Sequence, residues 1–380
     1  MEDAPIAPQR SRFAIPDDVY YFNCAYMSPL CHAVVEAMDA GTRRKASPWE
    51  FQPPHFFALA ERFRERAGML AGVDPSTIAI VPAASYGLAV AARNVSLAEG
   101  QEIVTLADQF PSNIYVWRER ARDSGARIVV ARRDADSDWT EAVLDAIGPD
   151  TGLAALPHCH WADGRMLDLE RIADKCRETG AALVLDLTQS LGAMPIDLTR
   201  VRPDFAVAAS YKWLMGPYGV GLLYCDPRHH DGAPIEHNWI NRAGSEDFSG
   251  LVDYRDDYQP GARRFDMGEK SNPPLIEGAV AAMDFLLKFG IEAVAATLGQ
   301  KTAALAKEAE RHGFASAPAG VGAPHYLSLG FPDGVPPDLL GDLARRKVFV
   351  SARGKSVRIT PHLYNDEADA EALIAALASL

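Results

Sequence analysis

The sequence lacks the long apolar runs that membrane-spanning helices need. Although 48% of its 380 residues are hydrophobic, no segment approaches the roughly 18 consecutive apolar residues of such a helix. The opening stretch MEDAPIAPQRSRF contains acids and prolines and no apolar core, so a secretory signal is not expected. We therefore expect no membrane partner. A chain of this length can bury the cores of one large and one smaller domain.

Cysteine and positive charge are also scarce. The five cysteines are odd in number and show no C-x-x-C spacing: Cys24, Cys31, Cys159, Cys176 and Cys225. This scatter argues against a disulfide or zinc framework and favours reduced thiols in the cytoplasm. The balance of 51 acidic against 38 basic residues gives a formal net charge of -13, so no nucleic-acid partner is expected. Neither a Walker lysine motif nor G-x-G-x-x-G is present, which disfavours a mononucleotide or dinucleotide ligand.

What the chain does contain is an alternation of short apolar, β-branched runs with amphipathic stretches. The amphipathic segment 167–180, for example, has the pattern of a helix that closes at Gly180. The apolar runs predict strands over 78–81, 102–106, 127–131, 153–156, 182–187, 205–209 and 221–225. Such alternation predicts an α/β fold with a mostly parallel central sheet and helices on both faces.

The pattern changes after Asp226, where a polar region rich in proline and glycine extends to about Pro274. Beyond it we expect a helix over 274–290, strands over 326–331 and 347–352, and a helix over 366–380. These elements predict a smaller α+β domain. The expected division is an N-terminal segment 1–40 that packs with the small domain, a large domain 41–270 and a small C-terminal domain 271–380.

Polar side chains stand where the predicted strands end. Asp186 lies at the end of the run LVLD, Gln189 follows three residues later, and Lys212 comes just after the run FAVAAS. Because ligands bind at the carboxyl ends of strands in open parallel sheets, a carboxylate and an amine are expected at the same edge. Taken alone, either charged residue could equally serve in an ion pair or as a helix N-cap.

A third feature is a candidate anion site. The strand 78–81 runs into PAASYGLAVAARN, where Ser85 opens a helix whose free N–H groups and dipole suit a phosphate. An amine for a Schiff base, an acid for the pyridine nitrogen and a seat for the phosphate are the groups that pyridoxal 5'-phosphate requires. The sequence therefore predicts this cofactor. Phe110, in DQFPSN, offers a ring to cover it, with an ordinary core phenylalanine as the alternative.

Three stretches carry a resemblance to a known family: LVLDLTQSLGAMPIDL, VRPDFAVAASYKWLMGPYGVG and VRITPHLYN. They resemble the class V aminotransferases, which are fold type I pyridoxal-phosphate enzymes. The resemblance implies that Lys212 forms the internal aldimine and later moves the substrate proton. It also implies that Asp186 pairs with the pyridinium nitrogen and that Gln189 bonds the phenolic oxygen of the cofactor.

The same resemblance implies further contacts. The positions where relatives contact the cofactor phosphate are Ala84, Ser85, Ser210 and Tyr211. Arg358 matches the arginine that grips the substrate carboxylate, a bidentate task for which lysine is a poor substitute. Phe110 is expected against the cofactor and Trp161 against the substrate.

The resemblance also bears on assembly. The segment 237–274 matches the part that, in relatives, reaches the partner's active site across a two-fold dimer. A homodimer with shared active sites is therefore expected, in which Ser271 contacts the cofactor and Asn272 the substrate of the other subunit. An ordinary surface loop is the alternative.

The stretch LPHCHWADG follows the predicted strand 153–156 and faces the same edge. Its histidines, His158 and His160, are spaced i, i+2 without a nearby carboxylate ligand, which is a weak metal signature. We expect no metal site, and a substrate-lining role for these side chains instead.

Sequence leaves the reaction open. Cysteine desulfurases need a cysteine in the C-terminal part, whereas the last cysteine here is Cys225. FPSNIY, SYKWL, KSNPP and RITPHLYN resemble kynureninase motifs, but YYFNCAYMSPL departs from the pattern of those enzymes. We expect a pyridoxal-phosphate enzyme that acts on a small α-amino acid by transamination, β-elimination, or C–S or C–C cleavage. The alternatives are a kynureninase-like hydrolase, an epimerase, a catalytically silent cofactor-binding regulatory module, or a lysine-dependent α/β enzyme without a phosphate cofactor.

Overall fold

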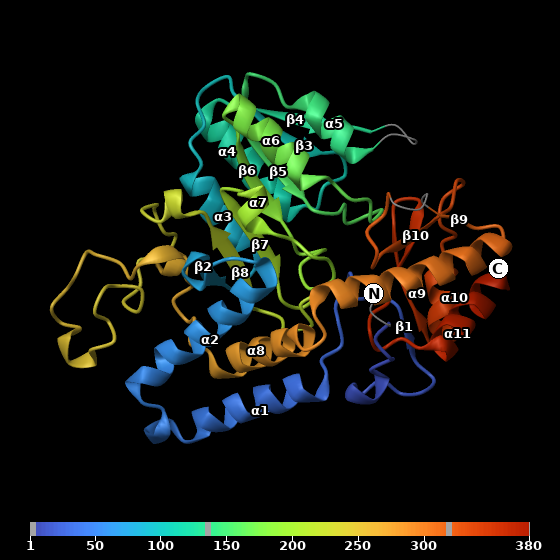
Figure 1. Ribbon diagram of the computed structural model, residues 1–380, viewed down its shortest axis with the longest axis horizontal. Coiled ribbons are helices and arrows are strands. Elements are labelled where there is room, and N and C mark those ends of the chain that lie inside the picture. Colours follow the sequence, from blue (N-terminus) through green and yellow to red (C-terminus); the bar gives the residue numbers. More distant parts are fainter. Residues whose placement is uncertain (1–4, 134–137, 317–320, 380) are drawn as a thin grey trace.

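A seven-stranded sheet forms the centre of the molecule (Figure 1), in a computed structural model that describes residues 5–133, 138–316 and 321–379. The strand order is β2-β8-β7-β6-β5-β3-β4. All neighbouring pairs are parallel except those of β8, which runs opposite to both β2 and β7. The strands are β2 (Ile78–Val81), β3 (Glu102–Leu106), β4 (Arg127–Ala131), β5 (Thr151–Pro157), β6 (Ala182–Asp186), β7 (Phe205–Ala209) and β8 (Gly221–Cys225). The mostly parallel α/β sheet predicted from the sequence is confirmed.

Helices cover both faces of this sheet because successive side chains of a strand point to opposite sides. In β2, Ile78 and Ile80 belong to one core, whereas Ala79 and Val81 belong to the other. The first core also contains residues of α2 (Pro53–Ala71), α5 (Trp139–Ala146) and α6 (Leu169–Thr179). The second contains residues of α3 (Ala84–Asn94) and α4 (Ser112–Ser124). Continuous apolar runs such as FAVAA are explained by this burial on two sides.

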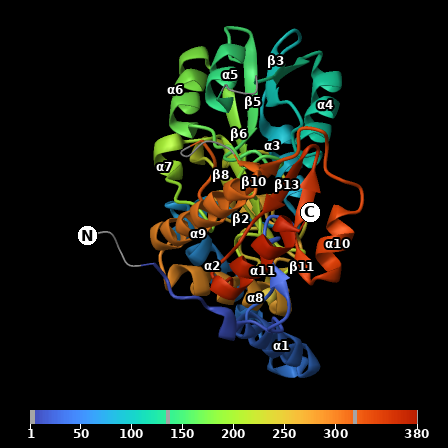
Figure 2. The same ribbon diagram turned by 90° about the vertical axis from the view of Figure 1, so that its right-hand side faces the viewer.

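The C-terminal part builds a second sheet with a separate core. This four-stranded antiparallel sheet has the order β12-β13-β10-β9. It faces the viewer in Figure 2, together with α9 (Ile291–Arg311) and α10 (Leu339–Arg345). The strands are β9 (Ala315–Ser316), β10 (Leu327–Gly330), β12 (Ser351–Arg353) and β13 (Ser356–Ile359), and α11 (Glu367–Ala378) ends the described chain.

The N-terminal segment contacts both parts of the molecule. β1 (Tyr20–Tyr21) pairs in parallel with β11 (Val348–Phe349), and Phe22 lies in the C-terminal core. α1 (His32–Ala46) lies along α8 (Pro273–Leu287) at the lower edge of Figure 1. Gly41 permits this close packing, since a Cβ there would lie 2.6 Å from the Pro273 carbonyl carbon. The borders 1–40, 41–270 and 271–380 remain a prediction.

Most predicted elements have their expected bounds, and one is wrong. The run 347–352 is not a single strand, because its halves pair with different partners: β11 with β1, and β12 with β13. The predicted helix 274–290 begins at Pro273 and ends at Leu287, and the predicted helix 366–380 begins at Glu367, with residue 380 outside the described chain. In the described ranges, no helix combines the length and apolarity needed to cross a membrane.

Candidate active site

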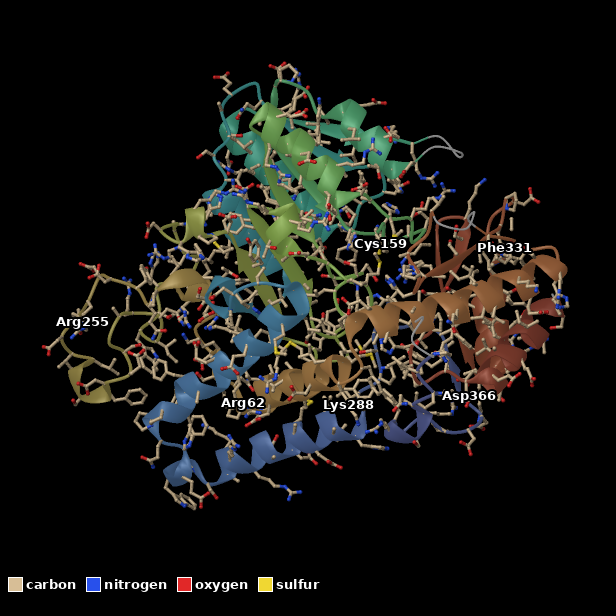
Figure 3. All side chains as sticks on the ribbon, in the orientation of Figure 1. Arg62, Cys159, Arg255, Lys288, Phe331 and Asp366 are labelled. Atoms are coloured by element: carbon tan, nitrogen blue, oxygen red, sulfur yellow. The ribbon has the colours of Figure 1, made fainter. Side chains whose placement is uncertain are left out.

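A pocket opens where the central strands end, on the side of the sheet that meets the C-terminal elements. Cys159, one of its lining residues, is labelled at this junction in Figure 3. The pocket brings together most of the sequence-predicted site residues: Ala84, Ser85, Phe110, Trp161, Asp186, Gln189, Tyr211 and Lys212. These come from five separate strand ends and turns of one sheet edge, as open parallel sheets dictate.

Lys212 occupies the turn after β7 and is only 7% exposed. Its Nζ lies 5.3 Å from the centroid of the Phe110 ring and 5.6 Å from that of Tyr211. Burial lowers the pKa of this amine to about 8, although the negative charge of Asp186 acts in the opposite direction. Near neutral pH the neutral amine is therefore much more populated than in an ordinary lysine, as a nucleophile or general base requires.

Asp186 is the last residue of β6, in register with Val207 of the parallel neighbour β7. Its side chain is largely buried, and the Thr188 N–H donates to Oδ1 at 3.0 Å. Within the described chain no group donates to Oδ2. An accessible carboxylate oxygen in the pocket wall suits a cationic N–H donor, such as a protonated pyridine nitrogen.

The N-terminus of α3 forms one wall of the pocket. Its N-cap residue, Ala83, supplies no side-chain cap, and no described group accepts from the backbone N–H groups of Ala84 and Ser85. Gly87 allows the helix to approach β7, because a Cβ there would lie 2.6 Å from Val207 Cγ1. These unpaired donors, with the positive end of the helix dipole, fit a phosphate group.

Gln189 is held at both ends of its amide. Nε2 donates to the Ala25 carbonyl at 3.1 Å, and Oε1 accepts from Trp213 Nε1 at 2.9 Å. An amide nitrogen carries two hydrogens, so one remains for a bound ligand. This fits the hydrogen bond to a phenolic oxygen that the resemblance implies.

Phe110 and Trp161 form an aromatic wall. Their rings meet edge to face, with centroids 5.4 Å apart. Trp161 Nε1 donates to the carbonyl of Asp108 at 2.6 Å. Asp108 has a φ of 52°, in the left-handed region that non-glycine residues seldom adopt. The turn after β3 is thus shaped to hold Trp161 in place.

Two predicted residues lie beside the pocket and do not line it. Arg358 is 1% exposed on β13; its Nη1 donates to the Trp161 carbonyl at 2.9 Å, and Nε and Nη2 donate to Ser351 Oγ at 3.0 and 2.7 Å. Ser210 is buried and donates to the Pro217 carbonyl. Arg358 is nevertheless close enough that its charge helps to lower the pKa of Lys212.

Ser271 and Asn272 lie outside this pocket and have partners within the chain. Ser271 donates to the Phe56 carbonyl, and the Asn272 side chain caps α8 by accepting from Leu275 N–H at 3.2 Å. The preceding segment 237–259 projects from the body of the molecule in Figure 1, with Arg255 labelled on it in Figure 3. Their contact with a second subunit remains a prediction.

The two histidines of LPHCHWADG lie outside the pocket, whereas Trp161 lines it, and its contact with a substrate remains a prediction. His160 Nε2 lies 3.1 Å from the Ala107 carbonyl, and burial lowers the pKa of His158 to about 4. Across the residues that the structure describes, no three His, Cys, Asp or Glu side chains are grouped to hold a metal ion.

Sequence reasoning missed several lining residues: Gln109, Cys159, Thr188 and Tyr218. Thr188 carried the clearest signal, because it lies between Asp186 and Gln189. Its Oγ1 accepts from Ala209 N–H at 3.2 Å and thereby ties the ends of β6 and β7 together. Tyr218 lies in an irregular turn, where no periodic pattern marks a buried or binding position.

Comparisons with known proteins find a family and individual relatives. The family described as Aminotransferase class-V matches residues 19–373. An uncharacterized aminotransferase of Bacillus subtilis, YcbU, is 26% identical over 90% of this chain and 88% of its own length. A kynureninase of Burkholderia mallei is 28% identical over 63% of this chain and 60% of its own length.

Solved structures extend the likeness to the fold. A variant of C-DES with glycine covalently linked to its PLP cofactor superposes with a TM-score of 0.90 at 22% identity. The match covers 98% of this chain and 100% of that one. A complex of the cystine C-S lyase C-DES with its reaction product, cysteine persulfide, superposes with a TM-score of 0.87 at 22% identity. The fold type I architecture expected from the sequence is thereby confirmed.

Proposed function

Because the chain belongs to the aminotransferase class-V family of pyridoxal-phosphate-dependent enzymes, we propose that it acts on a small α-amino acid through Lys212. The reaction is either transfer of the amino group or cleavage of a C–S or C–C bond at the β-carbon. One observation carries the proposal: a single pocket gathers a buried lysine with a pKa near 8, a carboxylate and the free N-terminus of a helix.

Each part of the cofactor has a matching group in the pocket. The N–H groups of Ala84 and Ser85 would hold the phosphate, and Asp186 Oδ2 would accept from the pyridine nitrogen. The remaining N–H of Gln189 would donate to the phenolic oxygen, and the Phe110 ring would cover one face. When bound, pyridoxal phosphate supplies an electron-poor ring that stabilises negative charge at the substrate α-carbon.

The protein's own groups then position the substrate and move protons. Lys212 Nζ would take a proton at the α-carbon, since burial lowers its pKa to about 8. Arg358 would hold the α-carboxylate, exchanging neutral oxygen acceptors for a charged one that binds more strongly. Phe110 and Trp161 would exclude water from the reacting atoms.

Cofactor attachment is the first test. Purified protein should absorb in the visible region after addition of pyridoxal phosphate, and the spectrum should change on addition of amino acids. After borohydride reduction, peptide mapping should find the pyridoxyl group on Lys212, and the Lys212→Ala variant should lack it. A protein that takes up no cofactor would contradict the proposal.

The reaction is decided by products. A panel of amino acids should be scored for keto acid, ammonia and sulfide, with Lys212→Ala as the blank. Keto acid formed with a second keto acid as acceptor indicates transamination, whereas ammonia or sulfide without an acceptor indicates a lyase. Spectral change without any product would favour a regulatory module, and recovery of the opposite enantiomer would favour an epimerase.

A kynureninase-like hydrolase is the second candidate. The 28% identity to the kynureninase of Burkholderia mallei and the motif KSNPP favour it. Release of an aromatic amine from kynurenine would establish this activity. Sulfur transfer to a thiol of the chain is not favoured, because the C-terminal part beyond Cys225 contains no cysteine.

We further propose a homodimer in the cytoplasm. Five unpaired thiols suit a reducing compartment. Several large apolar side chains are uncovered within the chain, among them Trp49 at 73%, Val252 at 78% and Tyr254 at 95% exposure. A second copy would cover such side chains, and the projecting segment would approach the partner's pocket.

A further inference from the structure

A second arginine accompanies Arg358 beside the pocket, behind its lining residue Trp161. Arg353 ends β12, one strand away from Arg358 on β13. The guanidinium carbons of Arg353 and Arg358 lie 5.3 and 5.8 Å from the centroid of the same Trp161 ring. The two arginines of one hairpin therefore converge on the residue that closes this side of the pocket.

Arg353 has no carboxylate partner in the described chain. Among the described residues, its guanidinium makes one hydrogen bond, from Nη1 to the carbonyl of the preceding residue, Ala352, at 2.7 Å. The nearby groups that act to raise the pKa of Arg353 are the phenols of Tyr326 and Tyr26, and neither is a carboxylate. Burial, with the neighbouring charge of Arg358 next, lowers the pKa of Arg353.

Without a bound anion, this arrangement of two arginines lowers the stability of the folded protein. Arg358 is buried and Arg353 is half-buried, and two neighbouring cations so placed disfavour the folded protein unless an anion joins them. Acids are not scarce, since the chain carries 51 acidic residues against 38 basic ones. None of the described acids pairs with either arginine. Both arginines also lie near enough to Lys212 to lower its pKa, so their charges reach the reacting end of the pocket.

We propose that Arg353 binds a second carboxylate of the substrate, carried on its side chain, while Arg358 binds the α-carboxylate. The inference rests on the proposed function and narrows its substrate class to amino acids with two carboxylates. Arg353 is then a specificity-determining residue. Its guanidinium fork suits a carboxylate, and stacking on Trp161 fixes its plane.

The alternative is a purely structural role, in which Arg353 only stacks on Trp161 and supports this side of the pocket. The carboxylate-binding and the structural role predict different affinities for a ligand that cannot react. Succinate carries two carboxylates and butyrate one, at the same chain length and without an amino group. Calorimetric titration of the cofactor-loaded protein should show that succinate binds at least about tenfold more tightly than butyrate.

Variants separate the two readings. Arg353→Gln should remove the preference for succinate and leave butyrate binding within about twofold, and Arg353→Lys should keep part of the preference. Lys355→Gln is the matched control, because Lys355 is an exposed cation of the same hairpin that donates to the Pro332 carbonyl. It should leave the preference intact. Circular dichroism confirms that each variant is folded.

Two results would overturn the assignment: equal binding of both acids by the parent protein, or equal losses of both acids in Arg353→Gln. The titration measures binding and needs no turnover, so it tests the role of Arg353 whether or not a reaction is found. Failure of the proposed function shows separately, as absence of cofactor uptake in the absorbance spectrum of the same samples.

Discussion

Lys212 is an amine in apolar surroundings, and its protonation sets what it can do. Burial lowers its pKa to about 8, against the effect of Asp186. Capture of pyridoxal phosphate by the cofactor-free protein should therefore accelerate with pH to a midpoint near 8, whereas an unperturbed lysine has a pKa of about 10.4. Stopped-flow absorbance across pH 6–11 measures this profile.

Asp186→Asn provides the internal check on that profile. Loss of the carboxylate charge removes the effect that raises the pKa of Lys212, so the midpoint should move below about 8. Turnover should also collapse, because an amide cannot keep the pyridine nitrogen protonated. An unchanged midpoint and near-normal turnover would contradict the assignment of Asp186.

Arg358→Gln tests the carboxylate contact. We expect KM for a carboxylated substrate to rise by about tenfold or more, because hydrogen bonds to charged groups contribute about 1.5–3 kcal/mol. Binding of the corresponding amine without a carboxylate should change little. The capture midpoint of Lys212 should rise, since Arg358 lowers its pKa. Equal losses for both ligands would mean that Arg358 is structural.

At the scale of residues, the sequence predicts which residues lie at the site better than it predicts the partners that they contact. Asp186 and Lys212 could be placed because each follows an apolar run whose end must lie at the sheet edge. The partners of Gln189 could not be placed in the same way. One of them, Ala25, is 164 residues away in sequence, and only the packing of the N-terminal segment brings its carbonyl into contact.

At the scale of elements, the close packing of α3 against the sheet positions the helix N-terminus that is proposed to bind the phosphate. A Cβ on Gly87 would lie 2.6 Å from Val207 Cγ1, and the β-branched Val207 is buried and stiff. Gly87→Ala should therefore destabilise the protein by about 1–3 kcal/mol despite alanine's better helix propensity. Displacement of α3 should also weaken cofactor binding. Thermal unfolding and cofactor titration measure the two effects.

Two further variants control for Gly87→Ala. Gly148→Ala places a methyl group in open space and should leave both quantities nearly unchanged. Adding Val207→Ala to Gly87→Ala should restore much of the cofactor affinity, because it removes the atom that obstructs the helix. If Gly87→Ala alone behaves like Gly148→Ala, the close approach of α3 to β7 does not matter for binding.

A buried charge cluster joins α2 to the edge of the sheet. Asp266 accepts from Arg64 and from Lys270 Nζ at 3.0 Å, and its Oδ1 accepts from the Ile80 N–H of β2 at 2.8 Å. Arg64 and Asp266 are both fully shielded from solvent. Asp266→Asn removes the carboxylate that two buried cations share and leaves Arg64 only its contact with Glu61, so it should cost about 3–5 kcal/mol of unfolding free energy.

The pH dependence of that cost has a definite sign. Burial raises the pKa of Asp266, but the charges of Arg64 and Lys270 outweigh it and hold the pKa below the ordinary value. A depressed carboxylate pKa stabilises the fold above about pH 4, and the contribution is lost as the pH falls through the lower folded value. Urea unfolding at pH 7 and pH 3 should show the Asp266→Asn effect shrinking in acid. The exposed Asp231→Asn is the control.

Elements with continuous burial were predictable, and short ones that depend on distant partners were not. β2, β3 and β7 match their predicted bounds because both of their faces are covered, which demands unbroken apolar runs. β1 has two residues and pairs with β11 across more than 300 positions of sequence. No local pattern marks such a strand, so the division of 347–352 could not be foreseen.

At the scale of the whole molecule, net charge and exposed apolar surface have opposite effects on the association of two copies. A formal net charge of -13 on each copy opposes association at long range. Yet the projecting segment is ordered: Arg242 stacks on Tyr258 at 4.1 Å and donates to the Asp256 carbonyl at 2.6 Å. A projecting segment that is held by such contacts and exposes Val252 and Tyr254 is suited to binding another protein surface.

Association therefore provides the last prediction. Light scattering should give twice the 41.2 kDa mass of one chain, and rising salt should strengthen the dimer by screening the repulsion.

Tyr254→Asp and Val252→Asp should weaken association by about tenfold or more, since few apolar anchors carry most binding energy. Leu340→Asp, on α10 at the opposite end of the molecule in Figure 1, is the matched control and should remain dimeric. Because Ser271 and Asn272 are expected to contact the partner's pocket, dissociation should reduce turnover while Lys212 keeps its cofactor. A parent protein that stays monomeric at every concentration, with full activity, would show that each pocket is complete within one chain.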